Sequence, residues 1–133
     1  MVITINIIKI GNNKCKGGDK MDQDINNYKV IEKNLDFFIE KYGEIYDAYE
    51  NFGKLVHEKG GPLDEKTRWL IKVALSTDCQ NEFSLRTHIL KALKGGCSRD
   101  EIEHAILLVA PTAGFPKTMR GLLVAREVLK GEK

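Results

Sequence analysis

The sequence predicts an all-α protein of about six helices. Two observations indicate this fold class. From about Asp24 to the end of the chain, apolar residues recur at intervals of three and four, the period of a helix with one buried face. Cap signals at Asp64 and Ser98, together with glycine pairs at 60–61 and 95–96, divide this stretch into segments of ordinary helix length.

The first twenty residues differ from the rest. Residues 1–10 resemble a short β-strand, and the Gly-, Asn- and Lys-rich segment after them has no apolar period. We expect residues 1–20 to be a flexible N-terminal appendage and residues 21–133 to form a single all-helical domain. Two explanations of the appendage stay open. It is an ordinary tail, or it is not native and precedes a start at Met21, since residues 16–21 can be encoded by a prokaryotic ribosome-binding sequence followed by ATG.

Two aromatic-rich helices are expected next, paired as a hairpin about a break at Gly43. Each carries apolar residues at helical spacing, which are Ile31, Leu35, Phe38, Ile39 and Tyr42 in the first helix and Ile45, Tyr49, Phe52 and Val56 in the second. The glycines at 60–61 and the proline after them end the second helix.

The third and fourth helices follow with recognisable ends. Asp64 is the expected N-cap of a helix that runs to about Thr77. The fourth helix is expected to carry His88 and to end at the Gly95-Gly96 pair, because glycine readily adopts the left-handed conformation that terminates helices.

The last two helices are separated by a proline-containing break. Ser98 and Glu101 form a capping-box pattern at the start of the fifth helix. Residues 105–110 are nearly all apolar, so we expect this helix to be central and buried. Residues 111–116 break it, and a sixth helix with apolar residues at helical spacing closes the domain.

Composition narrows the possible partners. The chain has 133 residues, 42% of them hydrophobic, which suffices for one compact core that would gain from self-association. A net charge of +2, from 21 basic and 19 acidic side chains that alternate along the chain, does not favour nucleic acid. No apolar run approaches the roughly 20 residues that span a bilayer. We therefore expect a soluble cytoplasmic protein without nucleic-acid or membrane partners.

The cysteines do not suggest a metal or a disulfide framework. Cys15, Cys79 and Cys97 are an odd number at unrelated spacings, without a Cys-x-x-Cys pair or a zinc-type cluster. We expect neither a structural metal nor a cofactor.

A polar stripe on the fourth helix is the strongest candidate site. Asn81, Ser84 and His88 lie at helical spacing and can therefore face one cavity or interface. Imidazole ordinarily titrates near neutrality, so His88 is expected to be the group that handles protons.

Several motifs occur in order over residues 63–129. They are LDEKTR at 63–68, then His88, Ala92 and Leu93, then GCSRDEIEHA at 96–105, AGFP at 113–116 and VAREVL at 124–129. In this order they resemble the carboxymuconolactone decarboxylase and alkylhydroperoxidase D-like family. The resemblance implies an all-helical fold that assembles into homotrimers or homohexamers, with pockets between helices at or near subunit interfaces.

The residues that carry redox chemistry in that family are not all present in this sequence. Its redox branch has Cys-x-x-Cys-x-x-x-His and a Glu on the preceding helix, and the corresponding positions here are Asn81, Ser84, His88 and Trp69. A Tyr often found before AGFP is replaced by Thr112. The chain is therefore closer to the decarboxylase branch, whose resemblance implies a cofactor-free lyase that acts on a small carboxylated lactone or keto acid.

In this interpretation His88 is the catalytic acid. Loss of carbon dioxide leaves a dienolate that must be stabilised and then protonated, which requires hydrogen-bond donors and one proton donor. Asn81 and Ser84 are candidates to orient the substrate, and His104, Thr112 and Trp69 complete the expected substrate-binding set.

Each candidate also has a structural interpretation. His88 could be a hydrogen-bonded interface residue, and His104 could cap a helix or pair with Glu101 or Glu103. Trp69 could belong to the core or to a subunit interface, and Asn81 and Ser84 could be the polar start of a helix.

Two alternative functions remain open as well. One is an alkylhydroperoxidase D-like peroxidase that uses Cys79, and the other is a non-catalytic oligomeric binding module.

Overall fold

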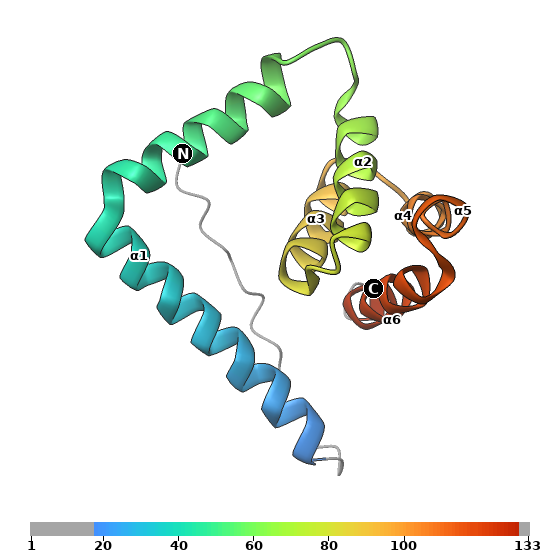
Figure 1. The fold of residues 1–133 in the computed structure, drawn as a ribbon, viewed down its shortest axis with the longest axis horizontal. Helices are drawn as coiled ribbons and strands as arrows, with labels where there is room; N and C mark the ends of the chain where they lie inside the picture. Colours follow the sequence, from blue (N-terminus) through green and yellow to red (C-terminus); the bar gives the residue numbers. More distant parts are fainter. Residues whose placement is uncertain (1–17, 131–133) are drawn as a thin grey trace. The chain divides into compact units, whose positions relative to one another are not determined.

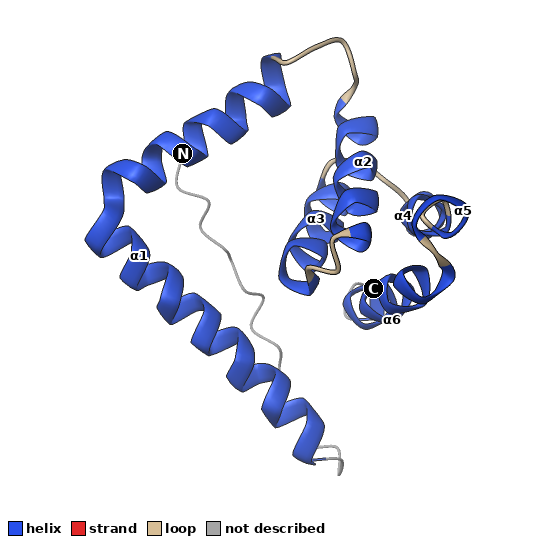
Figure 2. Cartoon of the chain, in the orientation of Figure 1, coloured by secondary structure: helices blue, strands red, loops and turns tan. Residues whose placement is uncertain are grey.

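The structure, a computed structural model, describes residues 18–130 and is helical throughout its regular elements (Figure 2). The predicted all-α class is confirmed. The expected appendage and its β-like run lie outside the described residues, except that residues 18–20 begin the first helix. None of the described helices combines the length and the apolar character needed to cross a bilayer.

The chain divides into two compact units, Met1–Asn51 and Phe52–Lys133, and each is described by itself. The single domain predicted for residues 21–133 stays a prediction. The second unit holds the end of α1 and the helices α2 to α6.

The first helix, α1, extends over Gly18–Lys59 (Figure 1). Tyr42 leaves the helical conformation, with φ −129° and ψ 37°, so α1 is two helical segments joined at a kink. The break predicted at Gly43 is therefore observed one residue earlier. The predicted hairpin is wrong, because the chain bends at this point and continues as a helix instead of reversing through a loop.

Two capped helices follow. The second helix, α2 (Glu65–Asp78), begins where the Asp64 carboxylate accepts a 2.8 Å hydrogen bond from the backbone N–H of Thr67. The third helix, α3 (Glu82–Lys94), ends at Gly95, and Gly96 then adopts a positive φ of 91°. Both caps agree with the sequence prediction.

The remaining helices pack around these two. The fourth helix, α4 (Arg99–Leu107), has the predicted capping box, in which Ser98 and Glu101 bond reciprocally to each other's backbone N–H. The short α5 (Ala110–Ala113) and the long α6 (Phe115–Lys130) follow. The prediction that the apolar run 105–110 is buried holds in part, because Ala105, Ile106 and Val109 are buried whereas Leu107 and Leu108 are exposed.

The core of the second unit lies where α2 packs against α3, α4 and α6. Its members are buried apolar side chains, which are Val73, Leu85, Ile89, Ala92, Cys97, Ile102, Ala105, Ile106, Val124, Ala125 and Leu129. The burial of these apolar side chains away from water is the main contribution that stabilises such a core. The core fixes α2 and α3 against each other and so positions the side chains between them.

Candidate functional site

A hydrogen bond between α2 and α3 defines the candidate site. The Nδ1 atom of His88 on α3 lies 2.7 Å from the hydroxyl of Ser76 on α2. Ser76 is buried, and its hydroxyl also lies 2.8 Å from the backbone carbonyl of Lys72, to which it donates. His88 is half-buried.

These two contacts select the imidazole tautomer. A hydroxyl carries one proton, and the Lys72 carbonyl can only accept, so the Ser76 proton is used in that bond. The other contact is then made by an Nδ1–H of His88 that donates to the Ser76 oxygen. The Nε2 atom of His88 is left as the proton acceptor, and Ser76 is the residue that orients the ring.

Three rings lie beside one another at this site. The centre of the Trp69 ring is 6.2 Å from that of His88 and 4.2 Å from that of His57, which lies near the end of α1 within the second unit. Gly95 leaves room for the indole, because a Cβ atom there would come within 2.8 Å of Trp69 Cδ1. The Trp69 Nε1–H donates to the Glu65 carboxylate at 3.4 Å.

Basic side chains surround Trp69. The amino groups of Lys72 and Lys91 lie 4.9 Å and 5.5 Å from the centre of its ring. Burial first, and then the charges of Lys91 and Arg68, lower the pKa of Lys72. We call Arg68, Lys72 and Lys91 the cation cluster.

The environment keeps His88 neutral at pH 7. Burial, followed by the positive charges of Lys72 and Lys91, lowers the pKa of His88 from its ordinary 6.5 to about 4. A hydrogen bond to the Lys72 backbone acts in the opposite direction and is outweighed. The expectation that this imidazole titrates near neutrality is therefore wrong for the chain by itself. The pKa of His57 is also lowered, by burial first and then by Lys72 and Arg68.

The structure brings together only some of the predicted site residues. Trp69 and His88 are neighbours, as described above. Asn81 is exposed, and its amide oxygen caps α3 by accepting a 3.0 Å hydrogen bond from the backbone N–H of Ser84, which is half-buried. His104 on α4 and Thr112 on α5 are exposed.

Several residues of the site were missed by the sequence interpretation. They are Ser76, Lys72, Lys91 and His57. Ser76 contacts His88 and Lys91 contacts Trp69 on another helix, so the spacing along the sequence does not indicate them. Lys72 could have been found, because it follows Trp69 by three residues and therefore lies on the same side of α2.

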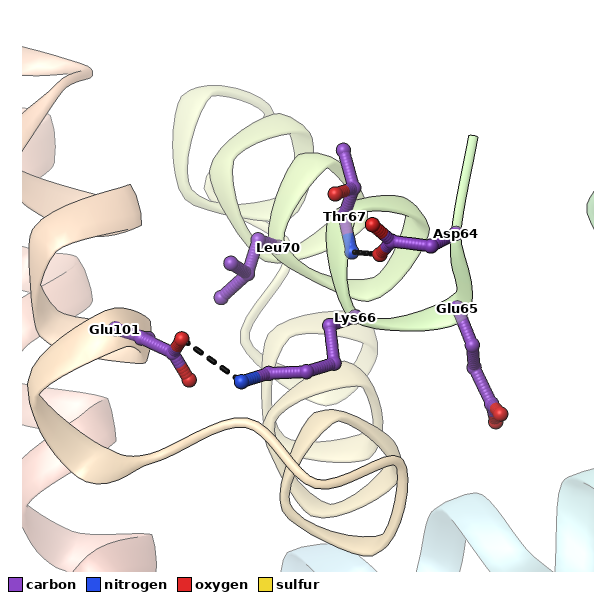
Figure 3. Close-up of a pocket in the computed structure, with 6 residues that line it drawn as sticks. All are labelled: Asp64, Glu65, Lys66, Thr67, Leu70 and Glu101. Atoms are coloured by element: carbon purple, nitrogen blue, oxygen red, sulfur yellow. Dashed lines mark hydrogen bonds and ion pairs between the residues drawn. The ribbon is translucent and has the colours of Figure 1, made fainter. Parts of the chain in front are cut away.

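A hollow in the described chain lies elsewhere (Figure 3). It encloses about 450 Å³ at the starts of α2 and α4, and its lining consists of Asp64, Glu65, Lys66, Thr67, Leu70 and Glu101. Its polar groups are paired with one another, since Lys66 contacts Glu101 at 2.9 Å and Asp64 caps α2. The hollow is therefore explained by helix capping, and none of the predicted site residues lines it.

The two described cysteines take no part in the site formed by Trp69, Ser76 and His88. Cys79 is exposed at the C-cap of α2, and Cys97 is buried in the core. Among the side chains that the structure describes, no three of His, Cys, Asp or Glu gather closely enough to hold a metal ion.

Fold and site together define a small all-helical protein whose candidate chemistry lies between two adjacent helices. The sequence profile of the carboxymuconolactone decarboxylase family matches residues 43–127, so the chain belongs to that family. It is 27% identical over 105 residues to a 4-carboxymuconolactone decarboxylase from Acinetobacter baylyi, and the match covers 74% of this chain and 77% of the relative. The predicted family is confirmed.

Solved structures share the fold. A carboxymuconolactone decarboxylase family protein from Legionella pneumophila superposes with a TM-score of 0.72 at 21% identity, covering 84% of this chain and 99% of that one. A protein from Burkholderia xenovorans, provisionally named a carboxymuconolactone decarboxylase, gives a TM-score of 0.62 at 26% identity and covers 74% of this chain and 79% of that one.

Proposed function

We propose that this protein is a cofactor-free lyase that removes carbon dioxide from a small carboxylated lactone or keto acid. The observation that carries the proposal is the 2.7 Å contact between Ser76 and His88, which orients a neutral imidazole beside the cation cluster. Membership of the carboxymuconolactone decarboxylase family and the named relative support the same reaction class.

The proposed step needs one proton and no redox partner. The bond between the substrate carbon and its carboxylate breaks, carbon dioxide leaves, and the electron pair moves into the conjugated carbonyl as a dienolate. Burial is the largest cause of the lowered pKa of His88, and the charges of Lys72 and Lys91 follow it. The substrate's negative charge offsets these two charges and raises the pKa of His88, which favours uptake of a proton from solvent by Nε2. His88 then gives that proton to the dienolate carbon, which accounts for all atoms and electrons.

The other predicted contacts depend on assembly. We retain Asn81, Ser84, His104 and Thr112 as proposed substrate contacts, with Trp69 as a wall of the site. His104 and Thr112 are exposed on their own chain, so they would contact substrate at an interface with a second copy.

We propose that such an interface exists in a homotrimer or homohexamer. Large apolar side chains are exposed on the described chain, including Leu75, Leu108 and Phe115, which are 58%, 59% and 67% exposed. Covering surfaces of this kind favours association. Sedimentation analysis is expected to give three or six copies, and a monomer at micromolar concentration would overturn this part of the proposal.

A decarboxylation assay tests the lyase. Purified protein is offered 4-carboxymuconolactone, the substrate named by its relative, and a set of small carboxylated lactones and keto acids, and released carbon dioxide is measured. We expect turnover without added cofactor. The rate should fall about 10²- to 10⁴-fold in His88→Gln, the range typical of losing a general acid.

Two controls make the assay decisive. Lys94→Gln changes an exposed residue at the end of the same helix and should leave the rate unchanged. An unchanged rate in His88→Gln would remove the assigned role. Peroxide turnover that is lost in Cys79→Ser, without any release of carbon dioxide, would replace the lyase with the peroxidase alternative.

A further inference from the structure

We infer that the amino group of Lys72 is a nucleophile that captures the ketone carbonyl of a small β-keto acid as an imine. The inference deepens the proposed lyase and rests on it for the loss of carbon dioxide, while the covalent bond to Lys72 can be tested by itself. It adds a catalytic residue on α2 to His88 on α3.

Lys72 belongs to a row of side chains on α2 that faces a second row on α3. Trp69, Lys72 and Ser76 are at helical spacing and share one side of α2, as His88 and Lys91 do on α3. The two helices pack side by side (Figure 1). Ser76 contacts His88 and Trp69 faces Lys91, so the rows meet. The Lys72 amino group, 4.9 Å from the centre of the Trp69 ring, therefore lies on the side of α2 that faces the imidazole.

No carboxylate holds the proton of the Lys72 amino group. Among the described residues, none lies within 4.0 Å of it, whereas Lys66 and Lys117 contact Glu101 and Asp78 at 2.9 Å and 2.7 Å. A carboxylate partner stabilises the ammonium form, which has no lone pair to attack with. The absence of such a partner therefore favours a nucleophilic amine at Lys72.

The surroundings of Lys72 also favour the neutral amine. Burial first, and then the charges of Lys91 and Arg68, lower its pKa. The face of Trp69 acts in the opposite direction, because an aromatic ring attracts an ammonium group. Lys91 lies at the same ring, 5.5 Å from its centre, and two ammonium groups at one ring repel each other. A half-buried lysine beside a second cation is suited to attack on a carbonyl group.

His88 is placed to handle the protons of this reaction. Imine formation needs a group that accepts a proton from the attacking nitrogen and returns one to the departing oxygen. The contact with Ser76 leaves Nε2 of His88 as the acceptor. The same Ser76 hydroxyl donates to the backbone carbonyl of Lys72 at 2.8 Å, so the imidazole and the lysine are held by one turn of α2.

Capture of the substrate balances without a redox partner. Nζ of Lys72 forms a bond to the ketone carbon, and the ketone oxygen leaves as water with the protons of the amine. The imine nitrogen then takes a proton from solvent and becomes positively charged. This nitrogen attracts electrons more strongly than the original ketone oxygen, which prepares the neighbouring carbon to lose its carboxylate.

Release of carbon dioxide regenerates the lysine. The bond between the carboxylate and its carbon breaks, and the electron pair moves toward the imine nitrogen to give a neutral enamine. His88 gives the enamine carbon a proton that it has taken from solvent. Water then attacks the imine carbon, the ketone product leaves, and Lys72 is restored as a neutral amine with one proton returned to solvent.

Reductive trapping with acetoacetate tests the inference. The protein is incubated with acetoacetate and sodium cyanoborohydride, which reduces an imine to a stable secondary amine, and tandem mass spectrometry locates the modified lysine. We expect Lys72 to be modified at least about 10²-fold faster than the exposed Lys94, because general acid–base assistance contributes about 10²- to 10⁴-fold. Omission of either reagent should abolish the adduct.

Two substitutions separate the amine of Lys72 from its charge. Lys72→Arg keeps the positive charge but presents a guanidinium that stays protonated, and Lys72→Met keeps only the aliphatic stem. We expect both variants to lose the adduct at this position and the release of carbon dioxide from acetoacetate above the spontaneous rate. A lysine that served only as a positive charge would be replaced by arginine without such a loss. Lys94→Met should react like the natural protein, and circular dichroism verifies the fold of each variant.

Lys91→Met tests the effect of the neighbouring charge. The titratable and charged groups around Lys72 are Lys91 and His88 of α3, Arg68 of α2 and His57 of α1. Removal of the Lys91 charge raises the pKa of Lys72 and leaves less neutral amine at pH 7. Trapping at Lys72 should therefore slow several-fold at pH 7, and the difference from the natural protein should shrink as the pH rises. Equal rates at every pH would contradict this charge coupling.

The inference and the lyase can fail separately. Modification of Lys72 no faster than that of Lys94, or an adduct on Lys91 in its place, would overturn the inference. Acetoacetate decarboxylation that continues unchanged in Lys72→Arg would also overturn it and leave the lyase with His88 alone. An adduct on Lys72 that keeps its carboxyl group, without release of carbon dioxide, would support the imine and remove the lyase.

Discussion

Along α6, acidic and basic side chains pair with partners on α2 and α3, whereas around Trp69 the same two helices place basic side chains close together. The three pairs are Asp78 with Lys117, Glu82 with Arg120, and Arg86 with Glu127, and we call them the ion-paired face. The cation cluster has no ion pair of this kind within the described residues. Both regions lie in the second unit and share its core.

The difference separates a structural role from a binding role. An exposed ion pair contributes only about 0–1 kcal/mol, but it favours the folded chain, so the ion-paired face is explained by stability alone. The cation cluster opposes folding, because burial first, and then the charges of Lys91 and Arg68, disfavour the charged form of Lys72. A feature that costs stability is expected where a protein binds or reacts with something else.

The largest expected effect comes from adding a methyl group at Gly121, in the core, and the matched change is made at Gly95, beside Trp69. In Gly121→Ala, the new Cβ would lie 2.6 Å from Thr77 Cγ2 and 3.1 Å from Ile106 Cγ2, both in buried side chains. Overpacking of this kind costs about 1–3 kcal/mol and exceeds the roughly 1 kcal/mol that alanine gains over glycine in a helix. We expect a net loss of up to about 2 kcal/mol in the free energy of unfolding, measured by urea denaturation.

Gly95→Ala is the matched change at the site. Its Cβ would lie 2.8 Å from Trp69 Cδ1, in a side chain that is only half-buried and can shift. We therefore expect a smaller loss of stability, together with changed fluorescence of the only tryptophan. If Gly95→Ala costs as much as Gly121→Ala, the site is packed as rigidly as the core and the contrast between them fails.

Local signals explain why most of the fold was predictable. The caps at Asp64 and Ser98 and the stop at Gly96 depend on atoms within a few residues, so the sequence indicates them directly. The break near Gly43 was visible for the same reason. Whether the chain reverses or only bends there depends on packing, and the structure shows a kink at Tyr42.

The site was less predictable because its parts come together only in the folded chain. Ser76 contacts His88 twelve residues away on another helix, and no spacing rule links them. The family resemblance drew attention to His88. Its pKa of about 4 could not be predicted, because it results from burial and from lysines on two helices.

Matched lysine substitutions in the ion-paired face and the cation cluster have the smallest expected effect on the free energy of unfolding. They test the comparison of the two regions most directly, because this free energy should fall in one variant and rise in the other. Lys117→Met removes a 2.7 Å ion pair with Asp78 and should lower the free energy of unfolding by about 0.2–1 kcal/mol. Lys72→Met removes a half-buried charge beside Lys91 and Arg68 and keeps the aliphatic packing near Trp69, which favours the folded chain. It also removes the 4.9 Å contact of the Lys72 amino group with the Trp69 ring, so we expect stability to rise by less than Lys117→Met lowers it. Urea denaturation of both variants at pH 7 and low salt measures the difference, and equal slopes confirm that the unfolded states are comparable. Destabilisation by both substitutions would mean that Lys72 stabilises the fold as Lys117 does, and the cation cluster would then need no ligand to explain it.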